Sequence, residues 1–60
     1  MTLNQQYSEA MHDGDHARCI RIEEQNGLYG YPPELVSTGL AEVDAGRDPM
    51  PAINAIIEGK

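Results

Sequence analysis

The sequence predicts a small all-α domain, in which three or four short helices form one compact unit over residues 1–60. Apolar residues recur at the three- and four-residue spacing of an amphipathic helix. Glycine, proline and aspartate stand where such helices would begin or end. The only strand candidate is the stretch from Arg18 to Glu23, where apolar residues alternate poorly with arginine, and we favour a helix there.

The first helix is expected over residues 3–12. Its apolar residues share one helical face, and they are Leu3, Tyr7, Ala10 and Met11. Thr2, followed three residues later by Gln5, matches the pattern of a capping box. The sequence therefore predicts a helix start immediately after Thr2.

The segment Asp13-Gly14-Asp15 interrupts this pattern, because glycine and aspartate favour turns and caps over helix interiors. Asp15 is the expected N-cap of a second helix over residues 16–26. One long kinked helix that absorbs the turn is the alternative. The apolar face of this helix is poorly defined, with Ala17 and Ile20 as its main members and Cys19 and Ile22 as weaker ones.

Asn26-Gly27 is a strong helix stop, because glycine adopts the left-handed conformation that follows many helices. Leu28 would then fold back onto Ile22. The following stretch, Leu28 to Pro33, cannot be helical, because proline lacks an N–H donor and biases the preceding residue toward extended geometry.

Pro33 suits the first turn of a third helix, which Gly46 closes. Gly39 lies inside this helix at a cost of roughly 1 kcal/mol, which is tolerable if another helix packs closely against it. Asp48 and Pro49 then cap and begin a fourth helix, which ends at Gly59-Lys60. We expect the last two helices to supply most of the aliphatic core, through Leu35, Val36, Leu40, Val43, Ile53, Ile56 and Ile57.

Ten acidic residues face four basic ones, which gives a formal net charge of −6. Direct nucleic-acid binding needs a positive surface and is therefore not expected. The acidity favours a partner protein with a basic surface instead. A chain of 60 residues buries only a thin core, so a partner or a second copy in a homodimer would stabilise it.

The chain contains no apolar run long enough for a membrane span and no signal peptide, so no membrane association is expected. Its single cysteine, Cys19, excludes an internal disulfide and suits a reducing compartment. A cytoplasmic location is the expectation.

No enzymatic activity and no cofactor are expected. His12, His16, Cys19 and Glu23 would share one face only if residues 12–23 formed one continuous helix, and they would then offer zinc ligands. A polar turn is the favoured interpretation, so we assign no metal site. A Cys–His nucleophile pair lacks an orienting third group and a substrate cleft.

The loop between the second and third helices carries Tyr29 and Tyr31 beside two prolines. Tyrosine is frequent at binding hot spots, although the same rings also cover small cores. Four carboxylates complete the predicted partner-binding set, and they are Glu23, Glu24, Glu42 and Asp44.

In size and charge over its whole length, the chain resembles small phage-encoded inhibitors, including anti-CRISPR and anti-restriction proteins. The resemblance rests on no motif. It implies a stoichiometric inhibitor whose carboxylates imitate nucleic-acid phosphates and occupy a basic channel on another protein. A self-associating structural or regulatory subunit is the alternative function, and a small metal-binding protein is a weaker one.

Overall fold

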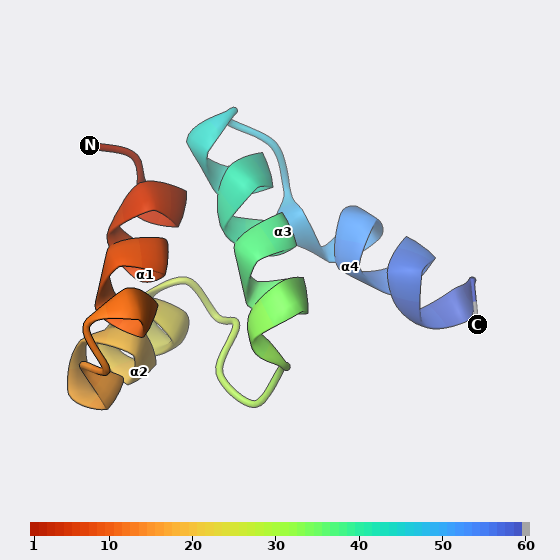
Figure 1. Ribbon diagram of the computed structural model, residues 1–60. Coiled ribbons are helices and arrows are strands. Elements are labelled where there is room, and N and C mark those ends of the chain that lie inside the picture. Colours follow the sequence, from red (N-terminus) through yellow and green to blue (C-terminus); the bar gives the residue numbers. More distant parts are fainter. Residues whose placement is uncertain (60) are drawn as a thin grey trace.

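The computed structural model describes residues 1–59, so Lys60 of the predicted 1–60 domain lies outside the described residues. The protein is built from four α-helices, and residues 1–59 contain no strand, which confirms the predicted all-α fold (Figure 1). The helices are α1 (Leu3–His12), α2 (His16–Gln25), α3 (Pro33–Asp44) and α4 (Pro49–Glu58).

Local hydrogen bonds explain where the helices begin. The Thr2 hydroxyl accepts a hydrogen bond from the Gln5 N–H at 3.1 Å, and the Gln5 side chain accepts one from the Thr2 N–H at 2.9 Å. Asp15 Oδ1 accepts from the Arg18 N–H at 3.2 Å, and Asp48 caps α4 through its own side chain. These bonds satisfy N–H groups that have no partner inside a helix, and they confirm the predicted starts.

The break between α1 and α2 lies at Gly14, whose φ is +70°. The Gly14 N–H donates to the carbonyl of Met11 at 3.2 Å, and the Asp15 N–H donates to the carbonyl of Ala10 at 2.9 Å. This pair of bonds is the Schellman motif that ends many helices. The alternative of one long kinked helix is therefore wrong.

The end of α2 has the same construction. Gly27 has a φ of +69°, its N–H donates to the Glu24 carbonyl at 3.3 Å, and the Leu28 N–H donates to the Glu23 carbonyl at 2.8 Å. The helix ends at Gln25, one residue earlier than predicted. The turn carries the Leu28 side chain into the interior, where it is fully buried.

Helix α3 is the centre of the arrangement. It packs against α1 on one side and α4 on the other, while α2 packs against α1. Figure 1 shows α1 and α3 side by side and α4 leading away from α1 and α2. Within residues 1–59, no helix combines the length and the apolar character needed to cross a membrane.

Gly39 lets neighbouring segments pack closely against the backbone of α3, as the presence of a glycine inside a helix suggested. A Cβ atom at Gly39 would lie 3.0 Å from Ile53 Cδ1 of α4 and 3.0 Å from Leu28 Cδ1. A side chain there would therefore separate the segments that meet at the middle of α3.

The core draws on all four helices and the loop. Its buried members are Tyr7, Ala10, Cys19, Ile22, Leu28, Val36, Leu40 and Ile53. Val36, Leu40 and Ile53 of the last two helices are buried as expected, but the expectation that Ile56 and Ile57 also belong to the core was wrong, since these residues are 40% and 48% exposed. The physical reason is that α4 packs mainly against one neighbouring helix, which covers only part of its apolar face.

The buried face of α2 also differs from the expected one. Cys19 and Ile22 are buried, whereas Ala17 is exposed and Ile20 is 42% exposed. Residues three apart share a helical face, and the pair on the buried face is Cys19 and Ile22. Apolar character alone did not distinguish this pair from Ala17 and Ile20, each of which lies two residues earlier in the chain.

Candidate partner-binding surface

The two tyrosines of the α2–α3 loop have different environments. Tyr29 is 62% exposed, whereas Tyr31 is half-buried and packs against the core. The Tyr31 N–H donates to the Leu28 carbonyl at 3.4 Å, and the left-handed Gly30 between the rings, with a φ of +97°, lets the chain turn there. Of the predicted aromatic pair, Tyr29 alone presents most of its ring to solvent.

Glu23 and Glu24 also differ, although they are neighbours on α2. Glu23 Oε2 accepts a hydrogen bond of 2.7 Å from the hydroxyl of Tyr7, a side chain that is only 2% exposed. Burial, and then the bond to Glu23, raise the pKa of Tyr7 well above its ordinary value. Glu23 therefore links α2 to α1, while Glu24 is exposed.

Glu42 and Asp44, near the end of α3, both have intramolecular partners. Glu42 forms an ion pair with Arg47, which lowers the pKa of the Glu42 carboxyl. Asp44 accepts hydrogen bonds from the N–H groups of Leu3 and Asn4 at 2.9 Å and 3.0 Å. These bonds, that from Asn4 first, lower the pKa of Asp44. A binding partner would have to compete with the fold for these carboxylates.

Five of the ten acidic side chains leave their negative charge unpaired within residues 1–59. They are exposed and make no side-chain hydrogen bond or ion pair with residues 1–59, and they are Glu9, Asp13, Glu24, Glu34 and Glu58. Of the carboxylates predicted to bind a partner, only Glu24 belongs to this group. The others were not recognisable as structural from the sequence, because their partners lie on other segments or after a turn.

The break at Gly14 separates His12 from the other residues that one continuous helix would have aligned as zinc ligands. His12 ends α1 and His16 begins α2, and both are exposed, whereas Cys19 is buried. Burial raises the pKa of the Cys19 thiol, as does the nearby Glu23 carboxylate. Among residues 1–59, no group of three or more His, Cys, Asp and Glu side chains is placed to hold a metal ion.

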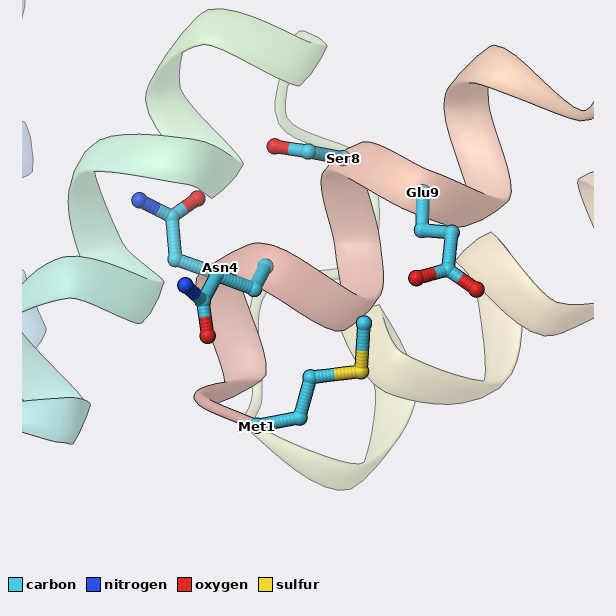
Figure 2. A pocket seen from close by; sticks show the side chains of 5 residues that line it. Met1, Asn4, Ser8 and Glu9 are labelled. Atoms are coloured by element: carbon cyan, nitrogen blue, oxygen red, sulfur yellow. The ribbon is translucent and has the colours of Figure 1, made fainter.

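One surface hollow lies along the outer side of α1. It is lined by Met1, Asn4, Gln5, Ser8 and Glu9. Figure 2 shows that the Ser8 and Glu9 side chains point in different directions instead of converging on one point. The hollow therefore lacks the convergent polar groups that orient a small ligand.

A second hollow lies on the surface where α1 meets the beginning of α3. It is lined by Tyr7, Ser8, Met11, Pro33, Glu34 and Ser37. Glu34 lines this hollow and also the third hollow, which is described next.

A third hollow lies between α3 and α4, and we call it the α3–α4 groove. It has a volume of about 230 Å3 and is lined by Pro32, Glu34, Leu35, Thr38, Ile56 and Ile57. Three aliphatic side chains dominate it, and Glu34 is the one charged residue among the described residues that line it. Sequence reasoning missed this groove because it assigned Leu35, Ile56 and Ile57 to the core. The sequence feature that could have revealed the groove is the wide apolar face of the last helix, because one neighbouring helix covers only part of such a face.

Comparisons with models of known protein families, with characterised proteins and with solved structures found no match for this chain. The functional interpretation therefore depends on the surface itself.

Proposed function

We propose that this protein is a non-enzymatic, acidic protein-binding module that acts as a stoichiometric inhibitor or modulator of a partner with a basic surface. The observation that carries the proposal is the set of exposed carboxylates with no side-chain hydrogen bond or ion pair within residues 1–59. They add to a chain whose formal net charge is −6. Such a field speeds the encounter with a basic surface and disfavours acidic ones.

Charge alone does not supply a tight complex, because an exposed ion pair contributes only about 0–1 kcal/mol. Affinity depends on buried aromatic and aliphatic anchors with polar contacts around them. Tyr29 is a suitable anchor, since it is 62% exposed and stands on the loop that turns at Gly27 and Gly30. In the proposed interface, the acidic residues speed the encounter with the partner, and apolar contacts such as that of Tyr29 supply the affinity.

The partner class that the acidity favours is a protein that handles nucleic acid in the cytoplasm. Such proteins carry basic channels for phosphates. Carboxylates presented by a small helical body would occupy such a channel and exclude the nucleic acid. This is the mode of action implied by the resemblance to small phage-encoded inhibitors.

The test is capture of partners from a cell lysate by the tagged protein at low and high salt, followed by binding measurements with each purified partner. We expect a partner with a basic surface, salt-sensitive binding, and displacement by DNA or RNA. A variant with all of the exposed carboxylates neutralised should lose the salt-sensitive binding, through the substitutions Glu9→Gln, Asp13→Asn, Glu24→Gln, Glu34→Gln and Glu58→Gln.

The matched control is Arg21→Gln, which changes the charge of an exposed side chain in the opposite direction. This variant should bind the partner as well as the wild type or more tightly. Undiminished, salt-insensitive binding by the neutralised variant would show that the acidic mechanism is wrong.

A second candidate function is a self-associating structural or regulatory subunit. The exposure of Ile56 and Ile57 favours it, because neighbouring aliphatic side chains on a small protein often mark an interface. The melting temperature of such an oligomer rises with protein concentration. A constant melting temperature and a monomeric mass at all accessible concentrations would exclude it.

A further inference from the structure

We infer that the α3–α4 groove is the docking site for an amphipathic helix of the partner, with aliphatic side chains facing the groove and a lysine or arginine beside Glu34. The inference rests on the proposed function and specifies the site and the chemistry of the occupant. It assigns the central contact to residues that sequence reasoning had placed in the core.

The groove offers an apolar surface that the fold leaves uncovered. Ile56 and Ile57 of α4 are 40% and 48% exposed, and half-buried Leu35 lines the groove from α3. At about 230 Å3, the groove is smaller than the ~300–1,000 Å3 of a site for a small organic ligand. It suits individual side chains that project from a larger body.

The walls of the groove favour a helix as the occupant. They are α3 and α4, so a third helix laid along them would place side chains at every third or fourth position against Leu35, Ile56 and Ile57. The alternative mode of peptide recognition is addition of a strand to a sheet edge, and residues 1–59 contain no strand that could receive one.

The charge of the groove decides between a basic partner and a second copy of this chain. Glu34 lines the groove, is exposed, and has no side-chain hydrogen bond or ion pair within residues 1–59. Within residues 1–59, none of the lining residues is basic. A second copy would bring together two chains that each carry a formal charge of −6. A helix with lysine or arginine beside its apolar face neutralises Glu34 instead.

The experiment titrates the isotope-labelled full chain with a synthetic amphipathic helical peptide of leucine and lysine, observed by NMR. A peptide with glutamate in place of every lysine serves as the charge control. We expect saturable shifts of backbone amides concentrated at Leu35, Thr38, Ile56 and Ile57. The glutamate peptide should bind at least about tenfold more weakly.

Matched variants test the residues. Ile57→Ser should weaken binding of the leucine–lysine peptide by about tenfold or more. Glu34→Gln removes one exposed ion pair and should weaken binding by about two- to fivefold. Ile20→Ser is the control for Ile57→Ser, because Ile20 is 42% exposed on α2 and lies outside the groove. It makes the same chemical change in a helix and should leave binding unchanged. Circular dichroism confirms that each variant is folded.

Different results overturn the inference in different ways. Saturable shifts that map outside the groove would reject this site and leave the acidic binding function standing. Failure of the leucine–lysine peptide to bind anywhere would reject the groove as a docking site for a basic amphipathic helix, whereas the acidic binding function would still be decided by the capture experiment. Equal binding of the glutamate peptide would reject the role of Glu34. Shifts at Ile56 and Ile57 that grow with protein concentration alone would identify a second copy as the occupant.

Discussion

Asp44, the last residue of α3, accepts a hydrogen bond of 2.9 Å from the backbone N–H of Leu3, the first residue of α1. The other oxygen of the same carboxylate accepts from the next N–H of α1 at 3.0 Å. A residue from a distant part of the chain thus completes the N-terminal cap of α1, alongside the local capping box. The negative charge also lies at the positive end of the α1 dipole.

We predict that Asp44→Asn lowers the melting temperature at neutral pH and flattens its fall in acid. The pKa of Asp44 is depressed in the fold, so its stabilisation is present above its unfolded value of about 3.9 and is lost as pH falls through the folded value. Thermal unfolding of wild type and variant from pH 7 to pH 3 measures this. Glu9→Gln is the control, because it removes the same charge without touching the cap. Identical pH profiles for Asp44→Asn and wild type would contradict the prediction.

Gly39→Ala should destabilise the protein by about 1–3 kcal/mol, because the added methyl would lie 3.0 Å from side-chain atoms of both Ile53 and Leu28. The gain in helix propensity, about 1 kcal/mol, offsets only part of this strain. Urea unfolding gives the difference in free energy. Combining the substitution with Ile53→Val should recover part of the loss, since the shorter side chain makes room. If Gly39→Ala were more stable than the wild type, α4 would have to move away from the added methyl group without losing stability.

Tyr7→Phe should lower the free energy of unfolding by about 0.5–1.5 kcal/mol at pH 7, because the phenolic hydrogen bond to Glu23 is lost. The raised pKa of Tyr7 favours its neutral form in the fold. Its stabilisation is therefore complete below the unfolded value of about 10 and declines as pH rises above it.

Urea unfolding at pH 7 and above pH 10 separates these effects. Tyr7→Phe should lose less stability at alkaline pH than the wild type. Tyr29→Phe alters an exposed ring that makes no side-chain hydrogen bond within residues 1–59, and it should match the wild type at neutral pH. A neutral-pH stability of Tyr7→Phe equal to that of the wild type would show that the bond contributes nothing net.

The Cys19 thiol should react slowly with a disulfide reagent in the folded protein. It is only 5% exposed, and burial together with the Glu23 and Asp15 carboxylates raises its pKa. Less thiolate and less access both reduce the rate, by at least about tenfold relative to the unfolded chain. Absorbance of the released thiol at pH 8, with and without denaturant, measures the ratio. Equal rates would place Cys19 at the surface.

The helix boundaries followed closely from the sequence, because each depends on neighbours within a few residues. Thr2 and Gln5 cap each other, and Asp15 and Asp48 cap the helices that follow them. Gly27 ends α2 through carbonyls of the preceding turn. Such bonds join residues that the sequence itself places side by side.

The sequence also pointed to close packing at Gly39, because a glycine inside a helix is costly without a compensating contact. It did not say which segments pack there. Ile53 and Leu28 both do, and Leu28 arrives from a loop. Packing partners depend on how the helices cross, which periodicity alone leaves open.

What the sequence determined by itself was the helical class, the caps and turns that limit the helices, and the acidic character of the chain, because caps, turns and charge are local properties. Only the tertiary structure decided that Asp44 and Glu23 serve the fold and that Ile56 and Ile57 line an open groove. Those roles depend on contacts between segments far apart in the chain. An apolar helical face is the same in sequence whether a neighbour covers it or not, so its function is set by where the other helices lie.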